Sequence, residues 1–145
     1  IGAILGKISK EYEEALAEFG MKVGIAFQMA DDILDYMAKE SELGKIVGKD
    51  IQEGKLTMPI FQLLKVCNQI ERKQVRELIK SKNNLQSEKF NFLGKLFEKY
   101  NVIEKSFDIA SSMIRDAKNK LDIFESSEVK EYLFCLADYT LYRRH

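Results

Sequence analysis

The stretch FQMADDILDYMAKESELGKIVGKDIQEGKLTMP, residues Phe27–Pro59, begins with an apolar helical pattern that carries three aspartates and continues into a loop rich in Gly-Lys pairs. At about 100° per residue, a helix places Gln28, Asp31 and Asp35 on one stripe, with Asp32 at its edge. The opposite side carries only apolar or small residues. A surface helix shows the reverse balance. We therefore predict a helix that is buried on most sides and has a polar stripe of carboxylates.

The two aspartates Asp31 and Asp35 are one helical turn apart, and like charges at this spacing, with Cβ atoms about 6 Å apart, repel each other. Two interpretations are open: a solvated helix end, or a site for a divalent cation that relieves the repulsion. Mg²⁺ typically takes one or two carboxylates and fills its other positions with water and phosphate oxygens. Taken alone, the D-D-x-x-D pattern favours the solvated helix end.

The loop after this helix favours a ligand site. Between Asp31 and Lys55 there are seven acids and four lysines. Lys45 and Lys55 each follow a glycine, which lets the backbone and the ammonium group approach a ligand closely. Each lysine by itself is more simply explained as a solvated loop cation. Carboxylates for a metal and lysines for a metal-bound anion are together the groups that a diphosphate site requires.

Composition limits the remaining possibilities. The 145 residues are 46% hydrophobic and 32% charged with no net charge, which is typical of one soluble globular domain, and no long basic run indicates a nucleic-acid partner. No stretch is long and apolar enough for a membrane span. Cys67 and Cys135 lie in apolar helical patterns, so we expect free, buried thiols in the cytoplasm, with a disulfide as the alternative.

The spacing of apolar residues predicts helices and no sheet. Gly20 and Gly24 lie inside the first long helix, where we expect them to mark close packing or a break. Residues 39–50 are predicted to form a loop, and Thr57 and Pro59 to open the next helix. The predicted helices cover residues 10–38, 57–70, 72–82, 88–100, 102–124 and 127–144.

The motifs between Phe27 and Pro59 closely resemble the second aspartate-rich region of the trans-isoprenyl diphosphate synthases. The pattern of that region is F-Q-x-x-D-D-x-x-D, then G-K-x-x-G-x-D, then a further lysine before T-x-P. This sequence fills every one of these positions: Phe27, Gln28, Asp31, Asp32, Asp35, Gly44, Lys45, Gly48, Asp50 and Lys55. The stretches GAILG and LADYTLYRR are also similar to that family, so the resemblance spans the chain.

The resemblance implies an all-α helical bundle, the C-terminal part of an isoprenoid-synthase fold. It also implies a prenyltransferase that joins isopentenyl diphosphate to an allylic diphosphate and uses Mg²⁺. By position, Asp31 and Asp35 would bind Mg²⁺ bridged to the allylic diphosphate, and Asp32 would help through water. Lys45 would contact that diphosphate, and Asp50 would support the cluster of metal and phosphate.

The resemblance also implies roles in substrate binding for residues outside the aspartate motif. Gln28 would face the same pocket, and Phe27 would lie near the isopentenyl group. Lys55 would support the phosphates. Arg143 or Arg144 could close over the isopentenyl diphosphate, with a solvated tail as the alternative.

The chain departs from the family in length. Its 145 residues contain neither the first aspartate-rich motif nor the upstream Lys-Thr pair of the family. We therefore expect residues 1–145 to be the C-terminal portion of one synthase domain and to be inactive in isolation. The alternative is a non-catalytic helical subunit that assembles with a partner synthase.

Two further expectations follow from the resemblance. Most family enzymes are homodimers, and the apolar helices at residues 90–100 and 103–124 offer surface for a dimer. The segment EGKLTMPI is more similar to medium- and long-chain synthases of the octaprenyl type than to short-chain ones.

Overall fold

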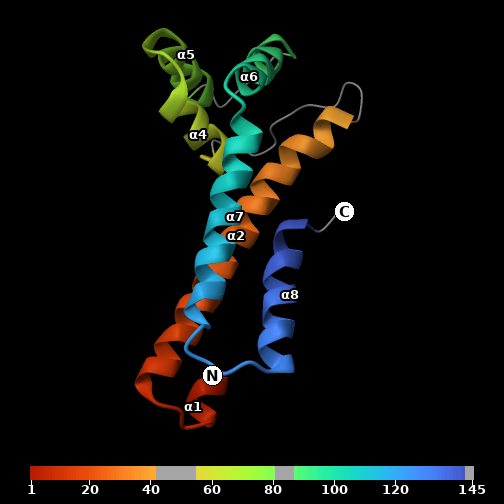
Figure 1. Ribbon diagram of the computed structural model, residues 1–145. Helices are drawn as coiled ribbons and strands as arrows, with labels where there is room; N and C mark the ends of the chain where they lie inside the picture. The colour runs from red at the N-terminus through yellow and green to blue at the C-terminus, as the bar shows by residue number, and fades with distance from the viewer. Residues whose placement is uncertain (42–54, 81–86, 143–145) are drawn as a thin grey trace. The chain divides into compact units, whose positions relative to one another are not determined.

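The computed structural model describes residues 1–41, 55–80 and 87–142 (Figure 1). Within these ranges no strand occurs, and the predicted all-α fold is confirmed. Every helix in the same ranges is too short or too polar to traverse a lipid bilayer. The helices are α1 (Gly2–Leu5), α2 (Lys10–Ser41), α4 (Met58–Val66), α5 (Gln69–Lys80), α6 (Ser87–Lys99), α7 (Val102–Lys120) and α8 (Glu128–Tyr142).

The chain divides into two compact units, of which the first comprises residues 1–30 and 109–145. Its buried side chains are mostly small, and small residues let helices approach closely. They include Ala26, Ala30, Ala110, Ala117 and Ala137. Ion pairs join the last turn of α7 to the neighbouring helices, from Lys120 to Glu18 of α2 at 2.7 Å and from Lys118 to Asp138 of α8 at 2.6 Å.

The second unit, residues 31–108, has a core of larger side chains. This core is one cluster of ten buried residues drawn from the end of α2, from α4, α5 and α6, and from the start of α7. Its members are Tyr36, Ile60, Leu63, Cys67, Val75, Leu78, Leu93, Leu96, Phe97 and Val102. The end of the aspartate helix α2 is therefore built into the core of this unit.

The helix predicted to open at Thr57 does so, since α4 has Thr57 as its N-cap and Pro59 in its first turn. The prediction that this helix continues to residue 70 is wrong. The backbone becomes extended at Cys67, and α5 starts two residues later. Asn68 and Glu71 form a reciprocal capping box, in which each side chain accepts a hydrogen bond from the other residue's backbone N–H, at 2.9 and 3.3 Å. This cap favours a new helix over a continued one.

The expectation that Gly20 and Gly24 mark close packing or a break in the first long helix is wrong. Helix α2 runs unbroken through Gly20 and Gly24, and a Cβ atom at either position would meet nothing within 4 Å. Packing of the apolar face of α2 therefore holds the helix despite the glycines' low helix propensity.

The prediction of two buried thiols is half right. Cys67 is buried and free as predicted, but Cys135 is exposed because it lies away from the buried face of α8.

Candidate functional site

Helix α2 carries the polar stripe that the sequence predicts. Asp31 is half-buried, Asp35 is exposed, and the two lie one turn apart on the same helix. On the other side of α2, Ile33 and Tyr36 are only 1% and 5% exposed. Ile25, expected on the apolar side, is 44% exposed, so the burial of this side is incomplete. The two carboxylates reach solvent from a helix whose opposite side is fixed in a core.

The segment that follows Lys55 returns to the aspartate helix. The Tyr36 hydroxyl and the Thr57 hydroxyl form a buried hydrogen bond of 2.9 Å. One residue later, the Met58 backbone N–H donates to the Asp32 carboxylate at 3.1 Å. These two bonds join residues 21 and 26 positions apart in the sequence. They fix the backbone just after Lys55 against the turn of α2 that contains the motif.

Asp32 has a role that the sequence analysis did not identify. Because Met58 is the first residue of α4, its N–H group has no partner within that helix. The negative carboxylate of Asp32 satisfies this donor and also lies at the positive end of the helix dipole. Nothing local in the sequence signals this contact, since it depends on the pairing of α2 with α4.

The fit of a divalent cation depends on the available donors. Asp31 and Asp35 offer two carboxylates on one side of α2, which suits the small number of protein ligands that Mg²⁺ takes. Among the described residues, no group of three acidic, cysteine or histidine side chains could hold a metal ion together. A cation bound by these two aspartates would therefore need oxygen ligands from elsewhere, as a phosphate-bound Mg²⁺ has.

The other predicted site residues divide into two groups. Phe27 and Gln28 lie exposed on α2, one turn before Asp31, and Lys55 is exposed next to α4. Lys45, Asp50, Arg143 and Arg144 lie outside the described residues.

The model of the polyprenyl synthetase family matches residues 1–96. A short chain isoprenyl diphosphate synthase of Methanothermobacter thermautotrophicus is 35% identical over 145 residues. The match covers 99% of this chain and 43% of that protein. The chain thus spans less than half the length of this relative.

Solved structures agree with this assignment. A decaprenyl diphosphate synthase from Rhodobacter capsulatus gives a TM-score of 0.84 at 31% identity, over 97% of this chain and 43% of that one. A polyprenyl synthase from Caulobacter crescentus, solved with calcium and isoprenyl diphosphate, gives a TM-score of 0.81 at 30% identity, over 99% of this chain and 44% of that one. Its sequence motifs, its helices and these similarities show that the chain belongs to the polyprenyl synthetase family.

Proposed function

We propose that this chain carries the second aspartate-rich half of the active site of a Mg²⁺-dependent prenyltransferase. The complete enzyme would join isopentenyl diphosphate to an allylic diphosphate and release a longer polyprenyl diphosphate. The observation that carries the proposal is the pair of hydrogen bonds from Tyr36 to Thr57 and from Met58 to Asp32. These bonds hold the backbone next to Lys55 against the aspartate helix, as a site for a metal-bound diphosphate requires.

The roles of the residues follow from their charge. Asp31 and Asp35 would hold Mg²⁺, which supplies positive charge to the leaving diphosphate. Lys45 and Lys55 would bind the diphosphate oxygens and stabilise the charge that develops on them. The polyprenyl synthase of Caulobacter crescentus, solved with calcium and isoprenyl diphosphate, supports a cation and a diphosphate as ligands of this family.

The reaction itself exchanges one bond for another. The allylic C–O bond breaks and its electron pair leaves with the diphosphate. The isopentenyl double bond attacks the resulting allylic carbocation to form the new C–C bond, and a proton is then lost from the isopentenyl unit. Both Phe27 and Gln28 lie one turn before Asp31. Gln28 would face the diphosphate pocket, and Phe27 would lie near the isopentenyl group, where its apolar ring helps to exclude water from the cation.

The experiment that tests this proposal is calorimetric binding of a non-ionising allylic diphosphate analogue, with and without Mg²⁺. We expect binding that requires Mg²⁺ and that disappears in the double variant Asp31→Ala, Asp35→Ala. The matched control is Glu13→Ala, Glu77→Ala, which removes two exposed carboxylates elsewhere and should leave binding unchanged. Circular dichroism shows whether each variant keeps its helices. A folded chain that binds no analogue would contradict a working half-site and favour the non-catalytic subunit.

The isolated chain should bind without turning over. Its 145 residues contain only one aspartate-rich motif, so we expect no measurable condensation product from isopentenyl and allylic diphosphates. Robust turnover by the isolated chain would overturn this expectation. The relatives include both short chain and decaprenyl synthases, so the proposed preference for longer products depends on an assay of the complete enzyme.

A further inference from the structure

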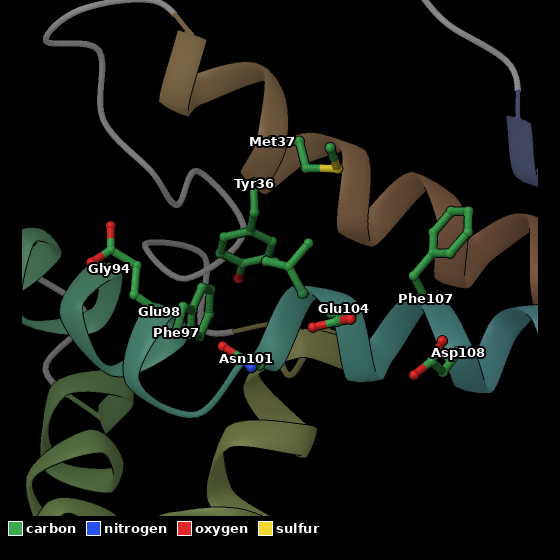
Figure 2. A pocket seen from close by; sticks show the side chains of 10 residues that line it. Tyr36, Met37, Gly94, Phe97, Glu98, Asn101, Glu104, Phe107 and Asp108 are labelled. Carbon is green, nitrogen blue, oxygen red and sulfur yellow. The ribbon is translucent and has the colours of Figure 1, made fainter.

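A cavity of about 570 Å³ opens on the surface of the second unit, between the end of α2 and the junction of α6 with α7 (Figure 2). All of its lining residues belong to residues 31–108. Its volume lies within the range of about 300–1,000 Å³ that is typical of small-molecule sites. Asp31, Asp32 and Asp35 do not line it.

The walls of this cavity are apolar and fixed. The rings of Tyr36 and Phe97 pack edge to face with their centroids 5.1 Å apart, and both residues are buried. The hydrogen bond to Thr57 holds the Tyr36 hydroxyl. Met37 of α2 and the α7 residues Ile103 and Phe107 provide the rest of the apolar lining. A wall formed by side chains that are already ordered binds an apolar group at little conformational cost.

The rim of the cavity is acidic. Glu98, Glu104 and Asp108 line it, and all three are exposed. Among the described residues, the lining contains no lysine or arginine. Among the described residues, none of the three carboxylates has a hydrogen bond or an ion pair. Glu104 and Asp108 lie on successive turns of α7, where like charges repel, so a cation bound between them would be stabilised (Figure 2).

We propose that this cavity binds a small cationic amphiphile, a molecule with one ammonium or guanidinium group on an apolar chain. The apolar chain would pack on Tyr36, Phe97 and Phe107, and the cation would lie at the rim beside Glu104 and Asp108. Charge complementarity carries the choice, because an anionic amphiphile would meet three carboxylates and no cation among the described residues that line the cavity. Asp31, Asp32, Asp35 and Lys55 do not line this cavity, and the proposal does not depend on the proposed prenyltransferase activity.

The first test uses decylammonium as a probe and decanoate as its partner of opposite charge, both below their critical micelle concentrations. Calorimetry on the 145-residue chain should show one saturable site for decylammonium. Decanoate should bind at least about tenfold more weakly, because its charge is repelled at the rim. Raising the ionic strength should weaken decylammonium binding, since the rim charges are exposed and screened. Equal affinity for the two probes would overturn the proposal.

The second test removes the rim charges. Glu104→Gln, Asp108→Asn should weaken decylammonium binding by about tenfold, the effect expected for the loss of two partly screened charges. The control Glu77→Gln, Asp116→Asn makes the same change of net charge on exposed residues that do not line the cavity. Unchanged affinity in the rim variant, or an equal loss in the control, would contradict the proposed site.

The third test fills the cavity. Gly94 lines it on α6, and a Cβ atom there would meet nothing within 4 Å, so Gly94→Leu can direct its side chain into the open space. We expect this variant to keep its helicity and to lose decylammonium binding. The control is Gly20→Leu, a change at another open position, on α2 and outside the cavity. Binding that survives in folded Gly94→Leu, or a stoichiometry above one, would mean that the probe binds elsewhere.

Discussion

Asp32 illustrates at the residue scale how one side chain of a motif takes on a structural role. Its carboxylate accepts the Met58 N–H at the start of α4, whereas Asp35, three residues later, is exposed. We expect Asp32→Ala to lower the free energy of unfolding by about 1 kcal/mol, the usual cost of losing a helix cap. Asp35→Ala should change it by less than about 0.5 kcal/mol, as exposed substitutions do.

Urea unfolding followed by circular dichroism measures both variants. Equal stability of Asp32→Ala and Asp35→Ala would mean that the contact with α4 contributes nothing. For binding of the diphosphate analogue we expect the opposite order: Asp35→Ala should weaken binding more than Asp32→Ala. The reason is that Asp35, rather than Asp32, shares the metal with Asp31 in the proposed site. The two measurements together separate the structural carboxylate from the binding one.

Glu71 connects the start of α5 to the end of α6. The Lys99 ammonium, at 2.7 Å, and the Tyr100 hydroxyl hold the pKa of this carboxyl below its ordinary value. A lowered folded-state pKa stabilises the fold at pH values above the unfolded-state pKa, and that stabilisation is lost as the pH falls through the folded-state pKa. We therefore expect the free energy of unfolding to fall as the pH drops below about 4.5.

The variant Glu71→Gln isolates this contribution. It cannot titrate, so the part of the acid-induced loss of stability that belongs to Glu71 should disappear from its unfolding free energies between pH 6 and about pH 3. Glu77→Gln, an exposed change on the same helix α5, should retain the steeper dependence of the original chain. Identical pH profiles for the two variants would show that the Lys99 pair has no effect on stability.

At the scale of elements, the junction of α4 and α5 shows what the apolar pattern misses. Residues 60–70 keep helical spacing, and the pattern alone predicts one helix. The break at Cys67 instead follows from the Asn68–Glu71 capping box, whose N-x-x-E spacing in the sequence competes with the apolar pattern. In contrast, the Thr57 and Pro59 signal was sufficient to predict the start of α4.

Helix α2 contains two glycines that the described structure does not require. A Cβ atom at Gly20 meets open space, and the helix is continuous there. Gly20→Ala should therefore raise the free energy of unfolding by up to about 1 kcal/mol, the difference in helix propensity between the two residues. Thermal and urea unfolding measure the gain. A loss of stability would instead support the close packing that the sequence analysis predicted at this position.

At the scale of the whole chain, α8 has an exposed apolar face. At about 100° per residue, four exposed side chains of α8 lie on one stripe. These are Val129 at 67%, Tyr132 at 67%, Leu136 at 55% and Tyr139 at 66% exposure. Contiguous apolar surface of this kind promotes association. We expect the chain to self-associate through this face as its concentration rises.

Substitution of this face tests the expectation. Leu136→Lys, Tyr139→Lys should reduce self-association in sedimentation experiments and leave the unfolding free energy nearly unchanged, because both side chains are exposed. Gln74→Lys, Asn119→Lys adds the same charge at exposed polar positions and serves as the control. Association that persists in the α8 variant would point instead to the dimer surfaces predicted at residues 90–100 and 103–124.

The fold class and the family can be predicted from the sequence, whereas the tertiary contacts of the site cannot. The all-α class and most helices follow from apolar spacing, and the family follows from the motif between Phe27 and Pro59. The contacts from Asp32 to Met58 and from Tyr36 to Thr57 could not be predicted, because they join positions 26 and 21 residues apart through tertiary packing. The cavity between α2, α6 and α7 was missed for the same reason.

The reaction rates of the two thiols can be used to measure local unfolding. Cys67 is buried in the core of the second unit, whereas Cys135 is exposed. A thiol-reactive dye should label Cys135 at once and Cys67 only when residues 31–108 open. The ratio of the two labelling rates, read from one sample, therefore gives the free energy of that opening. Ligands of this unit should slow only the second reaction.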